Sequence, residues 1–289
     1  MRILLTGSDG QLGRELQRAL PLLGTLLACD RRQCDLADAQ AVRDKIRAFR
    51  PNVIVNAAAY TAVDRAEHEL AQAFAVNATA PAILGEEAER LGALVLHYSS
   101  DYVFNGSGEH FQRETDLTCP ATAYGRSKLE GEHKLALATE RHLIFRTSWV
   151  LGPEGSNFAR TMLRLAAERD GIDVVNDQIG APTTTALITD VTLRAIRHRS
   201  LKPGVYHLAA AGQTSWHTYA CRVIETARAA GHRIKVAPDA VRAVSSRDYP
   251  ATAPRPLNSR LDTGKLRRAL EIEFDDWRCG VDHVLQQIL

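Results

Sequence analysis

Two side chains with acid–base chemistry, Tyr124 and Lys128, lie four residues apart in the sequence. On a helix this spacing puts both side chains on one face. A free phenol has a pKa of about 10 and is a poor acid at neutral pH, whereas a neighbouring ammonium favours the phenolate and lowers that pKa. The pair could therefore deliver a proton to a reacting oxygen. The alternative is an ordinary tyrosine–lysine pair on a solvated helix face.

Ser100 and Asp101 lie upstream of this pair and follow the apolar residues 94–96. A serine hydroxyl at that place can hydrogen-bond the carbonyl oxygen that Tyr124 protonates. Each residue alone would be compatible with a polar turn between a strand and a loop. Taken with Tyr124 and Lys128, Ser100 predicts a catalytic site that reduces a carbonyl group.

A glycine-rich turn, G-x-x-G-x-x-G, covers residues 7–13. It follows a predicted strand and opens a predicted helix, which is the context that a dinucleotide-binding turn requires. Glycines at Gly7, Gly10 and Gly13 would let the backbone approach a pyrophosphate, whose charge is favoured at the helix N-terminus. Asp30 follows the second predicted strand, and a carboxylate there can accept hydrogen bonds from the ribose hydroxyls of the cofactor. An ordinary turn with a surface aspartate is the alternative.

The choice between the two nicotinamide cofactors depends on Asp30 and its neighbours. The Asp30 carboxylate would repel a 2′-phosphate and favour NADH, whereas Arg31 and Arg32 could pair with that phosphate. We therefore expect the protein to use both NADH and NADPH.

The elements that must position these residues are strands that alternate with helices over residues 1–150. The strands are apolar throughout, as in parallel strands buried on both faces, and the alternation predicts a Rossmann-type, doubly wound α/β sheet. Pro81 is expected to kink or divide the third helix. The predicted strands cover residues 3–5, 26–29, 53–55, 94–96 and 143–145, and the predicted helices cover 11–20, 39–49, 71–91 and 124–138.

The pattern is less regular after residue 150. We expect residues 1–150 to bind the cofactor and residues 151–289 to form mainly a smaller substrate-binding lobe that interleaves with the first part. Residues 237–260 contain four prolines and are expected to be largely loop. Helices are predicted over 158–169, 189–198 and 217–230, and short strands over 174–175 and 205–207.

Composition excludes several classes of protein. The 289 residues carry a net charge of +2 with no long run of one sign, which gives no electrostatic footprint for nucleic acid or a membrane surface. The five cysteines include no C-x-x-C pair, so we expect reduced thiols and a cytoplasmic location. The histidines and cysteines form no metal-binding pattern either.

Beyond these features, the sequence resembles the extended short-chain dehydrogenase/reductases and, within them, the dTDP-4-dehydrorhamnose reductase branch. The Asn-Asp-Gln and Arg-Pro-x-Asn-Ser segments are typical of that deoxysugar reductase branch, whereas Y-x-x-x-K marks the superfamily alone. The matching segments lie at residues 4–7, 10–13, 55–64, 99–104, 124–128, 145–150, 176–183 and 255–259.

The resemblance implies reduction of the C4 keto group of dTDP-4-dehydro-L-rhamnose to dTDP-L-rhamnose, the last step in making a precursor of cell-surface polysaccharide. It implies that Tyr124, Lys128 and Ser100 are catalytic. It also implies a cofactor site made of Gly10, Gln11, Leu12, Asp30, Asp35, Leu36, Ala59, Tyr60, Thr61, Tyr98, Tyr124 and Lys128, and a nucleotide-sugar site made of Ser100, Asp101, Trp149, Asn176, Arg255 and Asn258.

Some relatives bind Mg²⁺ through acidic residues at a dimer contact. Glu15 matches one such position, but Ala186 falls at another and cannot bind a metal, so we expect no metal site. Whether the protein is a monomer or a homodimer stays open. Two alternatives to the implied activity also stay open. One is a reductase of another nucleotide-linked 4-keto-6-deoxysugar, including one of opposite stereochemistry, and the other is a non-catalytic NADP-binding regulatory subunit.

Overall fold

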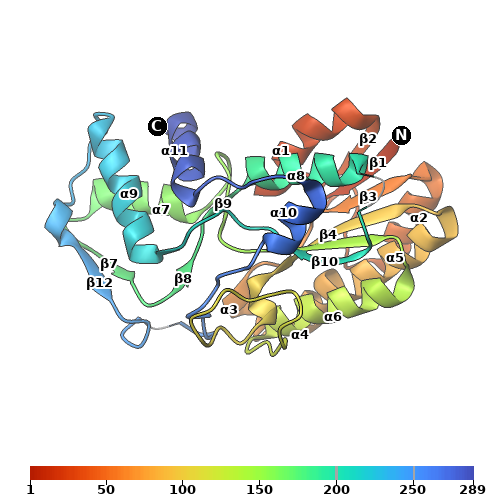
Figure 1. Ribbon diagram of the computed structural model, residues 1–289, viewed down its shortest axis with the longest axis horizontal. Coiled ribbons are helices and arrows are strands. Elements are labelled where there is room, and N and C mark those ends of the chain that lie inside the picture. Colours follow the sequence, from red (N-terminus) through yellow and green to blue (C-terminus); the bar gives the residue numbers. More distant parts are fainter. Residues whose placement is uncertain (199–200, 250) are drawn as a thin grey trace.

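A parallel six-stranded sheet forms the centre of the computed structural model, which describes residues 1–198, 201–249 and 251–289 (Figure 1). Its strand order is β10-β5-β4-β3-β1-β2. This confirms the Rossmann-type, doubly wound sheet that the sequence predicts. The strands are β1 (Arg2–Thr6), β2 (Thr25–Cys29), β3 (Val53–Asn56), β4 (Leu94–Ser100), β5 (His142–Thr147) and β10 (Gly204–His207).

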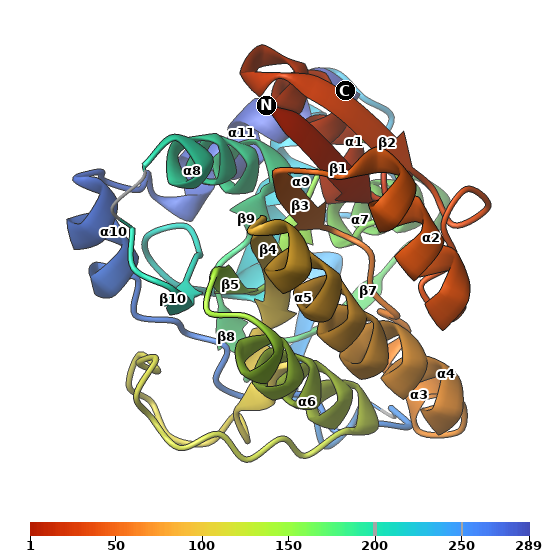
Figure 2. The same ribbon diagram turned by 90° about the vertical axis from the view of Figure 1, so that its right-hand side faces the viewer.

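Helices cover both faces of this sheet (Figure 2). Side chains alternate between the faces along each strand, so Ile3 and Leu5 pack against one layer of helices and Leu4 packs against the other. All three side chains are fully buried, which explains why the strand is apolar throughout. One layer contains α1 (Gln11–Ala19) and α8 (Thr185–Arg197), and the other contains α2 (Ala39–Phe49), α5 (Ala80–Leu91) and α6 (Ala123–Ala138).

The direction of winding reverses between β1 and β3, which are neighbours in the sheet. Ligands of open α/β sheets bind in the crevice outside the carboxyl ends of the strands at such a point. Here the turn after β1 packs closely on the segment after β3, since a Cβ atom on Gly7 would lie 2.6 Å from the Ala58 Cα. Gly7 also has a φ of 72°, which favours glycine.

The helix expected over residues 71–91 is divided, as Pro81 suggested. It consists of α4 (Leu70–Phe74), a turn of π-helix over Ala75–Thr79, and α5, in whose first turn Pro81 lies. Proline is tolerated there because the first turn of a helix needs no backbone N–H donor. The π-turn contains the buried Asn77, which becomes important at the site.

A second hydrophobic core holds the smaller lobe, which is seen at the left of Figure 1. The chain interleaves between the two parts, because β10 adds a strand to the main sheet and α8 packs on α1. The lobe contains α7 (Phe158–Glu168), α9 (Trp216–Ala229), α11 (Trp277–Ile288), β7 (Ile172–Val175) and β12 (Val241–Val244), with short pairings of β6 (Val150–Leu151) with β9 (Thr183–Thr184) and of β8 (Ile179–Gly180) with β11 (Thr214–Ser215).

Several details differ from the sequence-based expectation. Residues 237–260 contain β12, which pairs in parallel with β7 over all four of its residues despite the prolines around it. The helices α3 (Val63–Ala66), α10 (Gly264–Leu270) and α11 were not predicted. Among the described residues, no helix is both long and apolar enough to cross a membrane.

Candidate active site between two cavities

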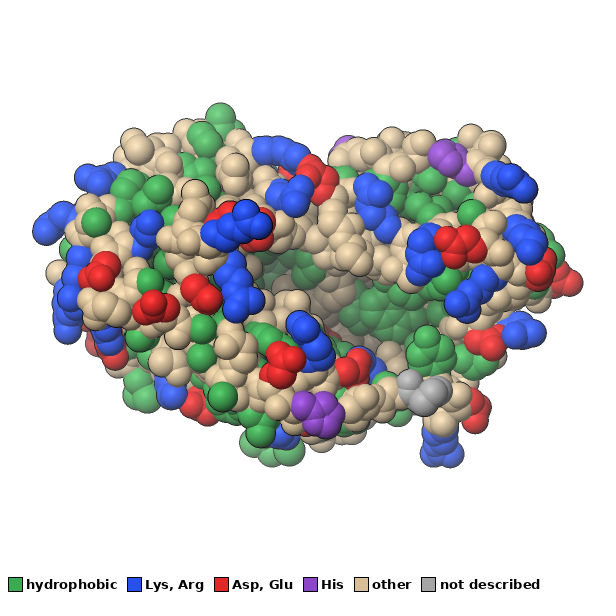
Figure 3. Space-filling model, turned by 180° about the vertical axis from the view of Figure 1, so that it is seen from behind, with side chains coloured by type: hydrophobic (Ala, Val, Ile, Leu, Met, Phe, Trp, Pro, Cys, Tyr) green, Lys and Arg blue, Asp and Glu red, His purple; other side chains and the backbone are tan. Residues whose placement is uncertain are grey.

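Two cavities meet beside Tyr124. The larger has a volume of about 940 Å³ and lies between the smaller lobe and the main sheet, and the smaller, of about 420 Å³, lies at the carboxyl ends of the strands. Figure 3 shows the hollow between the two halves of the molecule, with hydrophobic side chains along part of it. Both volumes fall in the range of small-molecule sites. The residues that line both cavities are Thr61, Ser99, Tyr124, Thr147 and Val150.

Helix α6 places Tyr124 in its first turn. The helix starts after Thr122, whose hydroxyl accepts a hydrogen bond from the Gly125 N–H at 3.0 Å and so caps it. Gly125 allows a close approach to the neighbouring segment, because a Cβ atom there would lie 2.2 Å from the Tyr102 carbonyl oxygen. The Tyr102 and Tyr124 rings then meet edge to face, with centroids 5.3 Å apart. These contacts fix the direction of the Tyr124 phenol.

The electrostatic environment of Tyr124 is dominated by burial. Burial raises the pKa of Tyr124 to about 12; the Ser100 hydroxyl opposes this shift, and the negative charge of Asp101 adds to it. Lys128 is not among the groups that cause this shift, so the prediction that it lowers the pKa of Tyr124 stays a prediction. Lys128 Nζ donates a hydrogen bond to the Tyr98 carbonyl at 2.6 Å.

The pKa of Lys128 is also shifted from its ordinary value. Its side chain is buried, and desolvation lowers the pKa of Lys128 to about 8, while the carboxylate of Glu132 acts in the opposite direction. Its Nζ also lies 3.3 Å from His97 Nε2. Lys128 therefore lies at the back of the site, held by two neighbouring residues of strand β4.

Ser100 and Asp101 form the floor of the larger cavity at the end of β4. The Ser100 Oγ donates a hydrogen bond to Asp101 Oδ1 at 2.9 Å and accepts one from the Tyr102 N–H at 3.2 Å. Burial raises the pKa of Asp101 to about 6, against the effects of the Ser259 and Ser100 hydroxyls. Its other oxygen, Oδ2, is buried and has no hydrogen-bond partner within the described part of the chain. A buried acceptor in this position is suited to a ligand hydroxyl.

The smaller cavity has the features of a dinucleotide site. Gly7 and Gly10 bring backbone to its surface at the N-terminal end of α1, where an anion is favoured. A side chain on Gly7 would clash with the backbone of Ala58, so only a glycine fits here, and Gly7 lines the cavity with its backbone. The predicted cofactor residues that line it are Gly7, Gly10, Gln11, Leu12, Asp35, Leu36, Ala59, Tyr60, Thr61, Tyr98, Tyr124 and Lys128.

Two predicted cofactor residues, Asp30 and Gly13, lie outside the lining of this cavity. The Asp30 carboxylate instead accepts a hydrogen bond from the Gln33 N–H at 2.9 Å and closes a turn. A Cβ atom on Gly13 would lie 1.9 Å from the Gly7 carbonyl oxygen, so Gly13 serves the close packing of α1 on the turn. Arg31 and Asp35 do line the cavity, and Arg31 Nε lies 3.3 Å from Asp35 Oδ2.

Trp149 lies in the lining of the larger cavity and has a φ of 47°, which is unusual for a residue other than glycine. Its ring stacks on Trp216 with centroids 3.7 Å apart, and on another side it meets Gly180, where a Cβ atom would lie 2.7 Å from Trp149 Cε2. Packing therefore holds the ring in place while part of it stays exposed to the cavity. Such a fixed aromatic surface suits a sugar or a base.

Arg255 also lines the larger cavity, where it is paired with Asp64 of α3. The Arg255 Nη2 lies 2.5 Å from Asp64 Oδ2, and the Ala253 N–H donates to Asp64 Oδ1 at 2.9 Å. This pairing lowers the pKa of Asp64. It joins a loop of the C-terminal third to a helix of the N-terminal third across the mouth of the site.

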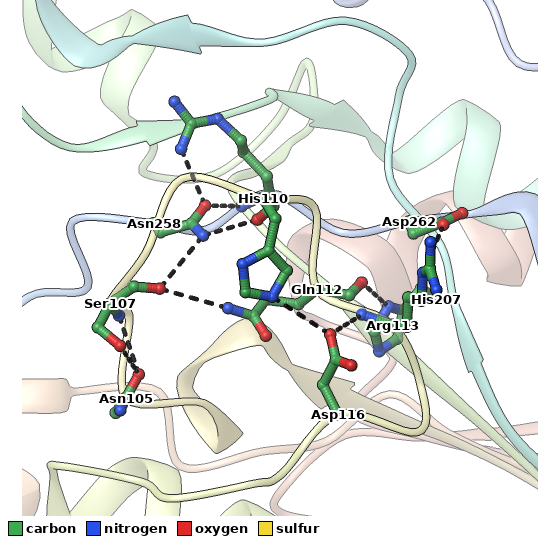
Figure 4. Close-up of polar contacts among 10 residues, drawn as sticks. Asn105, Ser107, His110, Gln112, Arg113, Asp116, His207, Asn258 and Asp262 are labelled. Carbon is green, nitrogen blue, oxygen red and sulfur yellow. Dashed lines mark hydrogen bonds and ion pairs between the residues drawn. The ribbon is translucent and has the colours of Figure 1, made fainter.

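The structure places Asn176 and Asn258 outside the lining of the larger cavity, and each side chain makes a hydrogen bond within the protein. Asn176 Oδ1 accepts a hydrogen bond from the Ser215 hydroxyl at 2.6 Å. The Asn258 side chain is buried and donates to the His110 carbonyl at 2.8 Å, so it holds the loop that follows β4 (Figure 4).

Other lining residues of the larger cavity were not predicted. Trp216 could have been found from its place after Ser215, since a serine before a helical stretch signals a helix start near the stacked ring. Further lining residues come from α7, from the Asn-Asp-Gln segment and from the loop after β12, and of these only the segment gave a local signal. They include Phe158, Met162, Gln178, Ser246, Arg247 and Tyr249.

No cluster of three or more histidine, cysteine or acidic side chains with metal-binding geometry occurs in the portion of the chain that the structure covers. Glu15, which matches a metal position of some relatives, faces Arg18 at 3.6 Å instead. The ionisable and hydroxyl side chains that line the two cavities include Tyr124, Lys128, Ser100 and Asp101.

Comparison with known proteins identifies the family. A family model described as the RmlD substrate binding domain matches residues 1–289. The chain is 48% identical to the dTDP-4-dehydrorhamnose reductase of Shigella flexneri, over 100% of this chain and 98% of that protein, and 47% identical to that of Escherichia coli K12 with the same coverage. Its structure matches that of dTDP-4-dehydrorhamnose reductase from Bacillus anthracis in complex with NADP, with a TM-score of 0.90, 33% identity and 99% of each chain covered. The chain therefore belongs to the RmlD family of dTDP-4-dehydrorhamnose reductases.

Proposed function

We propose that this protein reduces the C4 keto group of dTDP-4-dehydro-L-rhamnose to give dTDP-L-rhamnose, with NADPH or NADH as reductant. One observation carries the proposal: Tyr124 lies where a cavity of dinucleotide type meets a larger cavity with an aromatic wall, and Ser100 lines that larger cavity. A relative that is 48% identical over the whole chain is named for this activity.

The smaller cavity is the proposed cofactor site. Gly7, Gly10 and the N-terminal end of α1 would hold the pyrophosphate, Asp35 and Arg31 would face the adenosine ribose, and Lys128 would face the nicotinamide ribose. The chemistry that a bound NAD(P)H supplies is hydride donation to the carbonyl carbon. The B. anthracis relative was solved with NADP.

Tyr124 is the proposed proton donor. Burial keeps the phenol protonated at neutral pH, which is the form needed to deliver a proton to the C4 oxygen as that oxygen gains charge. The Ser100 hydroxyl would donate a second hydrogen bond to the same oxygen and orient the carbonyl. To do so it must turn from Asp101 Oδ1, which it contacts at 2.9 Å. Lys128 is still largely protonated near neutral pH, and its ammonium would bind the nicotinamide ribose.

The larger cavity is the proposed nucleotide-sugar site. Trp149 would pack its exposed face on the deoxysugar, and Asp101 would accept a hydrogen bond from a sugar hydroxyl through Oδ2. Arg255 and Arg247 would face the diphosphate. We further propose that residues 1–150 bind the cofactor and that residues 151–289 supply mainly the substrate site.

The two alternatives differ in what they require of these residues. A reductase of another nucleotide-linked 4-keto-6-deoxysugar would use the same proton donor, and only the face of the sugar that meets Tyr124 would differ. A non-catalytic NADP-binding subunit would have no need of Tyr124 at the junction of the two cavities, with Ser100 in the larger and Lys128 in the smaller.

The test is an NADPH-oxidation assay on enzymatically prepared dTDP-4-dehydro-L-rhamnose, with the product identified by NMR. We expect stoichiometric NADPH oxidation and dTDP-L-rhamnose as product. The epimeric 6-deoxytalose product would support the first alternative. Tight cofactor binding without oxidation on any keto-sugar nucleotide would contradict the proposal and support the second. In the same assay we expect KM values for NADH and NADPH within a hundredfold of each other.

A further inference from the structure

Behind Lys128 lies a buried row of polar side chains to which the reaction described above gives no role. His97 Nε2 lies 3.3 Å from Lys128 Nζ, His97 Nδ1 lies 3.0 Å from Asn56 Nδ2, and Asn56 Oδ1 lies 2.7 Å from Thr6 Oγ1. These three residues come from adjacent strands, β4, β3 and β1, and each is no more than 1% exposed. The row therefore crosses the middle of the sheet and is closed to solvent.

Each member of the row can reverse its hydrogen-bonding role. A neutral imidazole donates from one nitrogen and accepts at the other, an amide carries both kinds of atom, and a hydroxyl can do either. His97 stays neutral, since burial and the charge of Lys128 both lower its pKa well below the ordinary value. It therefore has one proton to place, on Nδ1 or on Nε2.

The protonation state of Lys128 decides which tautomer of His97 can form a hydrogen bond with its Nζ. A protonated ammonium has only donors, so His97 Nε2 must accept, its proton must lie on Nδ1, and the Asn56 oxygen must face it. A neutral amine has a lone pair, so His97 can donate from Nε2 and accept at Nδ1 from the Asn56 amide. The contact between Asn56 Nδ2 and His97 Nδ1 corresponds to the second arrangement, and rotation of the amide gives the first.

We propose that His97 is a positioning residue that holds Lys128 in both of its protonation states, by exchanging ring tautomers while Asn56 and Thr6 exchange donor and acceptor roles behind it. No buried polar atom of the row is then left unpaired when Lys128 gains or loses a proton. The Tyr98 carbonyl accepts a hydrogen bond from Lys128 Nζ in either state. The inference deepens the proposed function, because Lys128 acts beside Tyr124 there.

The other ionisable groups near Lys128 do not replace His97. Glu132, one turn later on α6, raises the pKa of Lys128, but its carboxylate is paired with Arg146 of β5 at 2.7 Å. Tyr124 lies one turn earlier and faces the cavities. His97 is thus the ring that contacts the Lys128 amine directly.

The first test needs neither substrate nor cofactor. In the wild-type protein labelled with ¹⁵N-histidine and ¹³C-lysine, NMR follows the titration of Lys128 and the tautomer of His97 in one sample. We expect His97 to carry its proton on Nδ1 below the Lys128 midpoint and on Nε2 above it. His207 is the internal control: it is equally buried, its Nδ1 faces the Gln112 carbonyl at 2.9 Å, and its tautomer should not change. A single His97 tautomer across the whole titration would overturn the proposal.

A pair of variants provides the second test. His97→Leu removes the hydrogen bond, whereas His97→Gln keeps an amide that can accept or donate. A charge-assisted bond favours the ammonium, so we expect His97→Leu to lower the Lys128 midpoint by about one pH unit, a tenfold change, and His97→Gln to keep it within about 0.3 unit. Equal midpoints for the two variants would mean that His97 is a packing residue and would overturn the proposal. If His97→Leu does not fold, the wild-type titration still decides.

The NMR titration measures the protonation of Lys128 and the tautomer of His97 without any assay of activity. Failure of this proposal is therefore distinguishable from failure of the proposed function. A protein that lacks reductase activity could still show the tautomer exchange. An active reductase with a fixed His97 tautomer would retain the proposed function without this device.

Discussion

Burial shifts the pKa values of the two ionisable side chains of the Y-x-x-x-K pair in opposite directions. It raises the pKa of Tyr124 to about 12 and lowers that of Lys128 to about 8. The spacing in the sequence predicted that both would lie at one site, and they do. It could not predict that the ammonium contacts the Tyr98 carbonyl, because that partner comes from a strand about 30 residues earlier in the chain.

The ionisation of Asp101 should be visible in the stability of the protein. Its pKa rises from an ordinary value near 4 in the unfolded chain to about 6 in the folded protein. The folded state then binds more protons than the unfolded state between pH 4 and 6, so stability should fall as pH rises through this window and level off above it. The size of the effect is on the order of 2–3 kcal/mol.

Asp101→Asn should remove this pH dependence. Chemical denaturation at several values between pH 4 and 7 should show the variant gaining stability relative to the wild type as pH rises. Asp190→Asn is the control, since Asp190 is an exposed residue of α8 that pairs with Arg194. Parallel curves for Asp101→Asn and the wild type would contradict the assignment of a raised pKa to this carboxyl.

Cofactor preference should depend on Arg31 and not on Arg32. Both arginines are exposed neighbours of Asp30 in the sequence, but Arg31 lines the smaller cavity. Arg31→Ala should raise the KM for NADPH about tenfold, as expected for loss of a phosphate contact, and leave the KM for NADH within about twofold. Arg32→Ala is the matched control. Equal effects of the two variants on NADPH would show that the 2′-phosphate does not lie against Arg31.

At the scale of elements, the strands and most helices were predictable because each carries its own periodicity. Two of the missed elements are short or close to prolines, since α3 has four residues and β12 lies between prolines, but the twelve-residue α11 has neither feature. The division of the helix near Pro81 was predictable, but the π-turn that precedes Pro81 was not. It places Asn77 so that its side chain amide donates to the Tyr60 carbonyl at 3.0 Å and to Ser127 Oγ of α6 at 3.0 Å. One irregular turn thus ties the cofactor-side loop to the helix of Tyr124.

The packing of α6 on this turn should be sensitive to one methyl group. A Cβ atom on Gly131 would lie 2.0 Å from the Asn77 carbonyl oxygen, which is backbone and cannot move away easily. We expect Gly131→Ala to lower the free energy of unfolding by about 3 kcal/mol and to reduce kcat, because α6 must shift. Gly264→Ala is the control, since its nearest neighbour is the flexible end of Arg268. Similar melting temperatures for the two variants would contradict this account.

At the scale of the whole molecule, the site exists only because distant parts of the chain meet. Asp64 and Arg255 are paired across the mouth of the larger cavity, and Trp149 stacks on Trp216. The sequence could indicate that segments 176–183 and 255–259 belong to the site, but not which side chains face the cavity. Asn258 is buried, so its amide must be paired, and it donates to the His110 carbonyl, whereas Asn176 is exposed and accepts a hydrogen bond from the Ser215 hydroxyl.

The interleaving of the main sheet with the smaller lobe also depends on contacts between distant parts of the chain. Strand β10 joins the main sheet beside β5, although it follows about 50 residues of the smaller lobe in the chain. Its apolar run predicted a strand but contained nothing to say which sheet it would join. The larger cavity is therefore framed by both parts, and Tyr124 lies at its boundary with the smaller one.

The most direct test of the central claim compares Tyr124→Phe with Tyr219→Phe. Tyr219 is buried in the smaller lobe, and its hydroxyl has no hydrogen-bond partner among the residues that the structure describes, so its loss should leave turnover unchanged. With dTDP-4-dehydro-L-rhamnose and NADPH, Tyr124→Phe should lower kcat by about 10²- to 10⁴-fold while the Kd for NADPH stays within about threefold of the wild type. A Tyr124→Phe variant that turns over at a rate close to that of the wild type would contradict the assignment of Tyr124 as proton donor.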